Sequence, residues 1–316
     1  MQHGGTIHRL AATPRTVHTG FFDSTIPPVL TILSGDTVNL STMMLMDDRL
    51  RGGMTVEELL ALRQGYADRK VGGQTLTGPI FVTGAEPGDV LEVRIGRLIP
   101  VDFGVNYHLP GHMGTGGLPE DFPSGSVKTF RLDRERWETA FAPGITLPLA
   151  PFLGVMGVAP RPGERRPAAV PDYFGGNMDN KELRTGTTLF LPVSVAGALF
   201  SAGDAHAAQG DGEVNVTAIE TALEEAVLQF VVRRDLRLER PQAETPTHWI
   251  TMGFHPDLDE AAKIALRDAI RFLAEVKGLA ADDAYAFASV AVDLRVTQIV
   301  DTNKGVHAMI PKHVFT

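Results

Sequence analysis

The sequence predicts a mainly β protein to which a small number of helices are added. Of its 316 residues, 33 are glycine and 21 are proline, which suits many turns and short strands better than a helical bundle. Short apolar segments, several alternating with period two, recur along the chain, whereas only three segments have the pattern of a helix. We predict a β-rich part over residues 1–150 and an α+β part over residues 151–316, which could form one intertwined domain.

The composition excludes several classes of protein. The net charge is −9 and no basic stripe occurs, so we expect no nucleic-acid partner. No apolar run approaches the roughly 18 residues of a membrane span, and the N-terminal segment lacks the apolar core of a secretion signal. We therefore expect a cytoplasmic protein with no membrane partner. Because the chain has no cysteine, any metal must be bound by His, Asp, Glu, backbone or water.

Three helices are expected, and local signals mark their ends. Thr55 followed by Glu58 three residues later is the pattern of a capping box. The longest predicted helix begins after Asp257, a favourable N-cap residue, and ends at Gly278. The predicted helices span residues 55–67, 258–277 and 282–292.

The strands are predicted from short apolar or alternating runs. Residues 76–98 are expected to form a hairpin, because two such runs flank a turn at residues 86–89 that contains proline and glycine. Residues 100–126 are rich in glycine and form a predicted loop, which could be a binding lid or a mobile surface excursion. The other predicted strands lie at residues 29–33, 37–40, 130–132, 145–149, 296–300 and 306–311, and residues 219–238 form a longer alternating segment.

The stretch over residues 175–220 is where we expect the functional site. It combines apolar strand-like runs with glycine-rich turns, and small residues between the charged ones leave room for a ligand against the backbone. So many side chains that can bind a divalent cation or move a proton are rarely gathered in a purely structural segment. These side chains are Asp179, Asp204, His206, Asp211, Glu213 and Glu220.

Spacing suggests roles for these residues. Asp204 and His206 are two residues apart, so on a strand both would face the same side and could bind one metal ion. Asp211 and Glu213 share this spacing, and one could complete the metal shell while the other acts as general base. We expect Glu213 to be that base, with Asp211 beside it, and Asp179 to be a third metal ligand.

Structural alternatives remain open for the same residues. The acid–histidine pair could be a buried hydrogen-bonded pair, Asp179 could be a turn residue, and Glu213 could face solvent at the start of a strand. Asn177 and Asn180 could orient an amide substrate, because a carboxamide side chain both donates and accepts hydrogen bonds.

Six blocks of sequence, all within residues 17–311, stand out: FFDSTIPPVLTILSGDTV, LTGPIFVTGAEPGDVLEV, PFLGVMGVAP, GGNMDNKELRTGTTLFLPV, ALFSAGDAHAAQGDGEV and DLRVTQIVDTNKGVHAMIP. These blocks resemble the acetamidase/formamidase family of amide hydrolases. The resemblance implies hydrolysis of short amides, such as formamide or acetamide, to the acid and ammonia. It also implies a CUB-like β-sandwich with α+β additions, and it is compatible with a bound divalent metal and a homo-oligomer.

Two positions depart from the family pattern. Ala205 lies between Asp204 and His206, where glycine is common in the family, and its methyl group would narrow the site slightly. Family members often carry a histidine just before the Leu-Thr-Gly-Pro phrase at residues 76–79, and this chain has Gln74 there. Glutamine is a poor zinc ligand, but it can hydrogen-bond a substrate. We therefore group Gln74 with the two asparagines as substrate-binding residues.

The resulting prediction is an amidase that hydrolyses small linear amides through a metal-activated water, with zinc or calcium as the metal. Amide hydrolysis needs a polarised carbonyl and an activated water, which a metal supplies, and a proton for the leaving nitrogen, which a carboxylic acid supplies. Two alternatives are a hydrolase of cyclic or larger amides, resembling a γ-lactamase, and a non-catalytic binding protein on the same fold. We expect a homo-oligomer, a dimer or higher.

Overall fold

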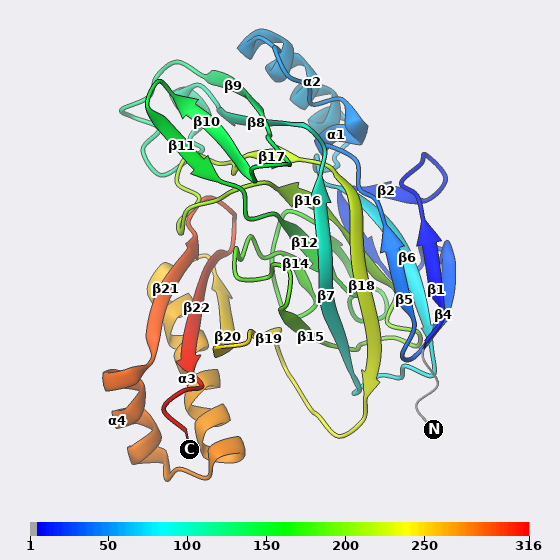
Figure 1. Ribbon diagram of the computed structural model, residues 1–316, viewed down its shortest axis with the longest axis vertical. Helices are drawn as coiled ribbons and strands as arrows, with labels where there is room; N and C mark the ends of the chain where they lie inside the picture. Colours follow the sequence, from blue (N-terminus) through cyan, green and yellow to red (C-terminus); the bar gives the residue numbers. More distant parts are fainter. Residues whose placement is uncertain (1–4, 316) are drawn as a thin grey trace.

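Two large β-sheets form the body of the molecule (Figure 1). Buried apolar residues of both sheets belong to one core. The structure is a computed structural model that describes residues 5–315. Across these residues each large sheet has nine strands, and two small sheets have two strands each. The first sheet contains, in spatial order, β1 (Ile7–Leu10), β5 (Thr37–Leu40), β18 (Leu223–Arg233), β7 (Val90–Pro100), β15 (Thr188–Pro192), β19 (Gln242–Glu244), β20 (His248–His255), β22 (Lys304–Pro311) and β21 (Asp293–Gln298).

The second sheet carries β6 (Thr75–Thr83) beside its main path, paired with three other strands. Its main path is β14 (Gly175–Asn177), β12 (Phe152–Gly157), β16 (Phe200–His206), β17 (Glu220–Thr221), β8 (Phe103–His108) and β9 (Ser126–Arg131), and β6 adds β2 (Val17–Thr19) and β4 (Leu30–Leu33). The small sheets are β10 (Glu138–Ala142) with β11 (Ile145–Pro148), and β3 (Phe21–Asp23) with β13 (Arg165–Pro167).

Apolar side chains from both large sheets meet between them. Phe200 on β16 and Phe230 on β18 are fully buried and meet edge to face, with ring centroids 5.1 Å apart. Val93 on β7 and Val155 on β12 belong to the same buried cluster. Buried aromatic pairs contribute both apolar area and specific geometry, so these contacts stabilise the sandwich. The expected mainly β fold with helical additions is confirmed.

Both large sheets take strands from each half of the chain. β18 lies between β5 and β7 in the first sheet, and β16 pairs with both β12 and β6 in the second. The division at residue 150 stays a prediction, and this interleaving favours its intertwined alternative.

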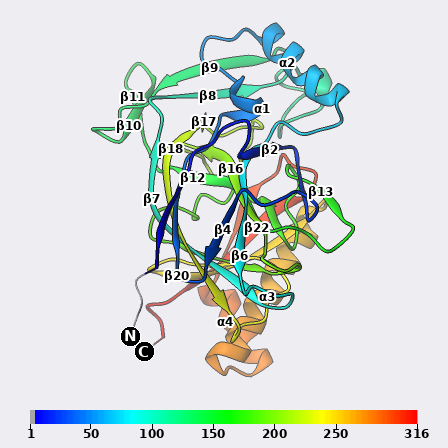
Figure 2. The same cartoon turned by 90° about the vertical axis from the view of Figure 1, so that its right-hand side faces the viewer.

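Two helices cover one end of the first sheet. They are α3 (Leu258–Lys277) and α4 (Ala281–Ala291), which pack on β20 and β22 (Figure 1). α3 lies so close to β20 that a Cβ on Gly253 would be 2.1 Å from the carbonyl oxygen of Ala261. Glycine at this position therefore permits the close approach of helix and strand. Figure 2 shows α4 at one end of the molecule and α2 (Val56–Asp68), with β8 and β9, at the other.

All three predicted helices are present, and their predicted caps are formed. Both hydrogen bonds of the Thr55–Glu58 capping box are made at the start of α2. Asp257 caps α3 by accepting a hydrogen bond from the third backbone N–H of the helix at 3.0 Å. Gly278 ends α3 in the left-handed conformation, with φ of 71°. No helix within residues 5–315 is long and apolar enough to span a bilayer.

Some predictions about local structure are wrong. β6 and β7 lie in different sheets, so residues 76–98 are not a hairpin; the turn at residues 86–89 carries the chain from one sheet to the other. Residues 103–108, expected in a loop, form β8 because they find partners in β9 and β17. A short helix, α1 (Leu45–Asp48), and a 3₁₀ turn, η1 (Gly111–Met113), were not predicted. The backbone of α1 is left-handed at Met46 and Asp47, and the spacing of apolar residues in the sequence does not predict such a conformation.

The N-cap of α3 gives a prediction about stability. Replacing Asp257 with Ala removes the side-chain acceptor for an otherwise unsatisfied N–H, so the free energy of unfolding should fall by about 1 kcal/mol. Asp257→Ser keeps an acceptor and should lose much less. Urea denaturation of both variants checks this, and equal losses would show that the cap is not the cause.

Candidate active site

The end of β16 carries the candidate site. His206, its last residue, pairs with Phe152 of β12 on one side and with Glu220 of β17 on the other. β14 pairs with the far side of β12 and ends at Asn177, two residues before Asp179. Four neighbouring strands therefore bring acidic side chains from distant segments around one histidine.

Three of the acidic residues have a backbone conformation that L-residues rarely adopt. Asp179, Asp204 and Glu213 have φ of 47°, 51° and 46°. Residues held in this region cost about 1 kcal/mol or more each and cluster at functional sites. Because Asp204 is left-handed within β16, its approach to His206 does not follow from two-residue alternation alone.

The chain beside Glu213 is fixed to the end of β21. Gly212 exchanges backbone hydrogen bonds with Thr297 and Ile299, each of 3.0 Å. This connection places the loop after β21 next to the cluster. Asp301, in that loop, thereby becomes a member of the site from a segment far along the chain.

Gly154 on β12 forms the floor under the histidine. A Cβ at this position would lie 2.5 Å from Asp179 Oδ1 and 2.8 Å from both His206 Cε1 and the Asp204 carbonyl oxygen. These distances are too short for real contacts, so the site requires glycine here.

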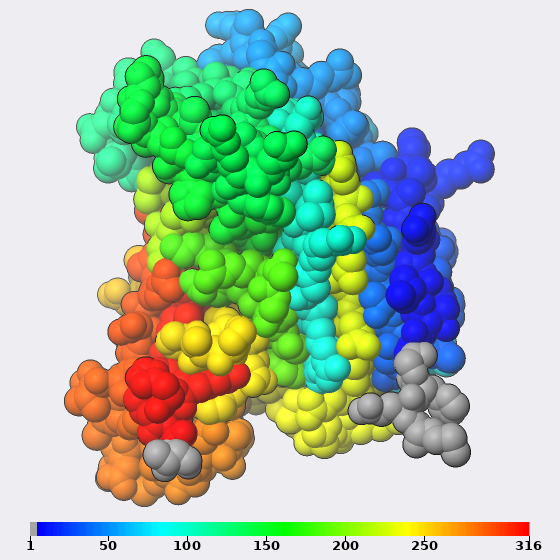
Figure 3. Space-filling view, viewed as in Figure 1, coloured from blue at the N-terminus to red at the C-terminus, as the bar shows by residue number. Residues whose placement is uncertain are grey.

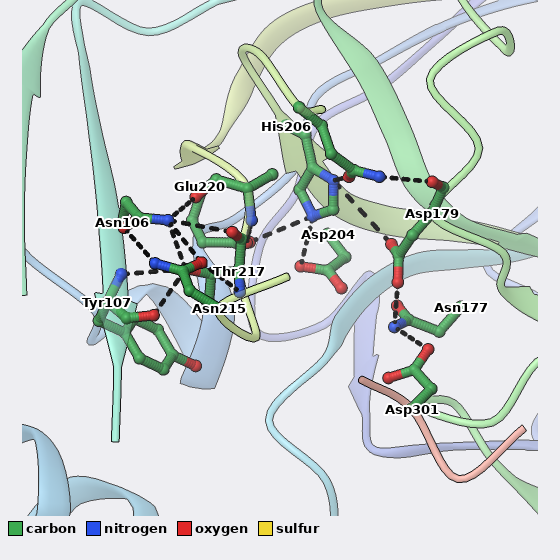
Figure 4. A network of polar contacts seen from close by, with 12 residues as sticks. Asn106, Tyr107, Asn177, Asp179, Asp204, His206, Asn215, Thr217, Glu220 and Asp301 are labelled. Carbon is green, nitrogen blue, oxygen red and sulfur yellow. Dashed lines mark hydrogen bonds and ion pairs between the residues drawn. The ribbon is translucent and has the colours of Figure 1, made fainter. Parts of the chain in front are cut away.

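The imidazole of His206 separates two groups of carboxylates (Figure 4). Its Nε2 lies 3.3 Å from Glu220 and 3.7 Å from Asp204, and its Nδ1 lies 3.9 Å from Asp179. The His206 side chain and these three carboxylates are each at least nine-tenths buried. Two sets of three possible metal ligands therefore share the histidine, one with Asp204 and Glu220 and one with Asp179 and Glu213.

Gln209 distinguishes these two sets. Its Nε2 donates to the Asp179 carbonyl oxygen at 2.7 Å, which turns its Oε1 toward His206 Nδ1, 2.9 Å away. An amide oxygen can only accept, so Nδ1 must donate. In the neutral ring the Nε2 lone pair is then left free, and it faces Asp204 and Glu220. A partner on the second ring nitrogen is the usual way in which a protein orients a metal-binding histidine.

The second group of carboxylates is held by an amide. Asn177 Nδ2 donates to Asp179 Oδ2 at 2.6 Å and to Asp301 Oδ2 at 2.9 Å. Glu213 joins this group, since one of its oxygens lies within 4.8 Å of ligand atoms of both Asp179 and His206. Oxygens of Asp179 and Glu213 are buried without a hydrogen-bond partner in the described chain.

Burial and mutual repulsion change the protonation of the cluster. Burial raises the pKa of Asp179 and of Glu220 to about 7, and His206 opposes the rise. Burial, with Asp179 adding to it, raises the pKa of Glu213 and Asp301 well above their usual range. Burial alone would lower the pKa of His206, but Glu220 and the neighbouring acids raise it well above its usual value. Carboxylates this close need shared protons or a cation.

A network of hydrogen bonds orients the Glu220 carboxylate. The Ala218 N–H donates to Glu220 Oε1 at 3.0 Å, so the other oxygen faces the histidine. Asn106 on β8 holds this segment by donating to the carbonyl oxygens of Thr217 and Ala218 (Figure 4). The network therefore orients one carboxylate before any ligand binds.

A cavity of about 610 Å³ reaches the cluster at Glu213. Glu213 is the one acid of the five described above that lines this cavity; Gln209 lines it too. The other four acids are not part of this lining. Glu213 is thus positioned to contact both a ligand in the cavity and the buried carboxylates.

The predicted site residues divide into those that converge and those that do not. Asp204, His206, Asp179 and Glu213 meet as described. Asp211 lies outside the cluster, because its half-buried carboxylate pairs with Arg295 at 2.8 Å and Lys181 at 3.2 Å. The expected Asp211–Glu213 pair is thus split.

Asn177, Asn180 and Gln74, the three amides predicted to bind substrate, do not line this cavity. Asn177 holds carboxylates, as described, and Asn180 caps a turn by accepting from the Glu182 N–H at 3.0 Å. Gln74 Oε1 is buried against Gly72. Their role in substrate binding stays a prediction.

Sequence reasoning did not assign roles to Glu220, Gln209, Asn106 or Asp301. Glu220 and Gln209 lie in the predicted stretch, and the density of polar groups there was the available signal. Asn106 and Asp301 are brought to the site by contacts between segments far apart in the sequence, and no local sequence pattern indicates such contacts.

Comparison with known proteins identifies relatives over nearly the whole chain. The model of the Acetamidase/Formamidase family matches residues 8–164 and 163–316. A formamidase from Methylophilus methylotrophus is 27% identical over 76% of each chain, and an acetamidase from Mycolicibacterium smegmatis is 28% identical over 44% of this chain. The crystal structure of an acetamidase from Bacillus halodurans superposes with a TM-score of 0.87 at 33% identity, covering 97% of this chain and 98% of that one.

The coverage of the curated relatives is less complete than that of the solved structure. The chain spans 48% of the length of the Mycolicibacterium smegmatis acetamidase and 61% of a relative from Schizosaccharomyces pombe.

The floor of the site gives a second prediction. Gly154→Ala would press a methyl group against Asp179 and His206, so we expect a loss of about 2 kcal/mol in the free energy of unfolding. Gly210→Ala is the matched control from the same region, because a Cβ there meets nothing within 4 Å. Denaturant unfolding measures both, and a Gly154→Ala variant as stable as the control would contradict the close contact.

Proposed function

The chain belongs to the acetamidase/formamidase family, and from this premise we propose that it hydrolyses small linear amides to a carboxylate and ammonia. Water adds to the carbonyl carbon, the carbon–nitrogen bond breaks, and the nitrogen leaves with an added proton. The observation that carries the proposal is the position of Glu213, at the boundary between a cavity and a buried cluster of carboxylates around a histidine.

Glu213 suits the proton transfers of this reaction. Its burial and its acidic neighbours raise its pKa, so its carboxylate is a stronger base than that of a free glutamate and retains a proton that it has accepted. A carboxylate at the wall of the cavity can take a proton from the attacking water and return it to the leaving nitrogen. Asp179, within reach of Glu213, fits the role of a second proton holder.

The residues also fit a divalent cation, held by Asp204, His206 and Glu220. Asp204 Oδ1 and Glu220 Oε2 are buried without a hydrogen-bond partner among residues 5–315, and both face the ring nitrogen that Gln209 leaves free. Bound there, a cation would supply Lewis acidity to the site and offset the buried negative charge. The imidazole favours zinc over calcium, since calcium takes oxygen ligands. Glu220 replaces Asp179 in the predicted ligand set, because Asp179 lies on the donating side of the ring.

A homo-oligomer and a cytoplasmic location remain parts of the proposal. Leu118, Phe122 and Val214 are each more than half exposed and together line a second cavity of about 350 Å³. Exposed apolar side chains gathered in one place commonly mark contact surfaces, which supports association with a second copy. The cytoplasmic location stays a proposal.

Glu213 provides the direct test of catalysis. Glu213→Gln removes the proton acceptor but preserves side-chain size, so ammonia release from formamide and acetamide should fall by about 10²- to 10⁴-fold while the melting temperature is retained. Glu224→Gln, an exposed change on β18, is the control. Unchanged turnover in Glu213→Gln would rule out its role, and an inactive parent protein would favour a non-catalytic binding protein.

Gln209 tests the metal site through binding instead of activity. Gln209→Leu removes the acceptor that orients His206, so the affinity of the metal-free protein for Zn²⁺ should fall about 10- to 100-fold. Titration against a chelating dye measures this affinity. Gln64→Leu, an exposed change on α2, should bind as the parent does, and the same affinity in both variants would contradict the positioning role.

A further inference from the structure

The cavity beside Glu213 is larger than the smallest amides need. Its volume of about 610 Å³ falls within the range of roughly 300–1,000 Å³ that holds drug-sized ligands. Acetamide carries only a methyl group on its carbonyl carbon. If the carboxamide of a substrate lies at Glu213, most of the cavity is left for the rest of the molecule.

The wall of the cavity is apolar and comes from four segments. Phe130 on β9 and Phe141 on β10 stack with ring centroids 6.0 Å apart and an interplanar angle of 27°. Leu147 on β11 and Ile219 before β17 complete this wall. Figure 3 shows the green segment that includes β10 and β11 at the surface of the molecule. The cavity therefore has a carboxylate in one part of its lining and an aromatic and aliphatic surface in another.

The charged groups of the lining do not select an anionic substrate. Lys181 already pairs with Asp211 at 3.2 Å, and Arg184 is exposed to solvent, where a single charge contributes little binding energy. Glu182 pairs with Arg295 at 2.8 Å. Besides Arg184 and Glu213, the part of the lining that is free to contact a ligand is mainly apolar.

We propose that the preferred substrates are primary amides whose acyl group is apolar and larger than acetyl, such as medium aliphatic or arylacetic amides. This inference rests on the proposed amidase function and names its substrate class. Phe130, Phe141, Leu147 and Ile219 form the acyl-binding wall. The products are the longer carboxylate and ammonia, so the reaction consumes water and needs no other co-reactant.

A series of amides tests the substrate class with the parent enzyme. Ammonia release is measured for acetamide, propionamide, butyramide, hexanamide and phenylacetamide. Because burial of each methylene favours binding, kcat/KM should rise about fourfold per added methylene through the aliphatic series. A flat or falling series with active acetamide overturns this inference and leaves the proposed function standing. No ammonia from any amide overturns the proposed function itself.

Variants on β11 locate the preference in the wall. Leu147→Ser places a hydroxyl in the cavity and should lower the ratio of kcat/KM for hexanamide to that for acetamide by about tenfold. Ile145→Ser, on the same strand but outside the cavity lining, should keep the parent ratio. Phe141→Ser, a half-exposed position, is the second variant should Leu147→Ser fail to fold. A parent-like ratio in the folded wall variant overturns the assignment.

Discussion

Five carboxylates gather around one imidazole at the end of β16, and their mutual repulsion is the constraint on which the site depends. Four of them are almost completely buried, where an uncompensated charge costs several kcal/mol. Burial raises the pKa of Asp179, Glu213, Glu220 and Asp301, which means that it disfavours their charged forms. Shared protons or a cation must offset this cost. The proposed roles in binding a cation and transferring protons are consistent with this requirement.

The surrounding fold holds this arrangement by using backbone conformations that regular strands avoid. Left-handed φ at Asp179, Asp204 and Glu213 turns each carboxylate inward, and Gly154 leaves the space that they enter. The two large sheets supply the rigidity, since a strained residue persists only where its surroundings overdetermine it. Asn177 and Asn106, both amides, then satisfy carboxylate and carbonyl oxygens that strands alone leave open.

The sequence predicts those features that local interactions determine. The capping box at Thr55 and the N-cap at Asp257 are local, and both helices begin where expected. The acids and the histidine of residues 175–220 were found by their density. The two-residue spacing predicted that Asp211 and Glu213 would lie on the same face of a strand. The backbone is left-handed at Gly212 and Glu213, and the Asp211 carboxylate pairs with Lys181 while that of Glu213 is buried in the cluster. Asp301 meets Asn177 across 124 positions, and such contacts depend on sheet topology.

Gln209 and Glu213 link the buried cluster to the cavity, and their chemistry explains why the two can coexist. Gln209 is neutral and uses both ends of its amide inside the protein, so it closes the cluster without adding charge. Glu213 alone among the five acids lines the cavity, and a carboxylate close to its apolar wall is disfavoured unless a polar group meets it. A primary amide with an apolar acyl group resolves this mismatch, because its polar end meets the carboxylate while its hydrocarbon end displaces water from the wall.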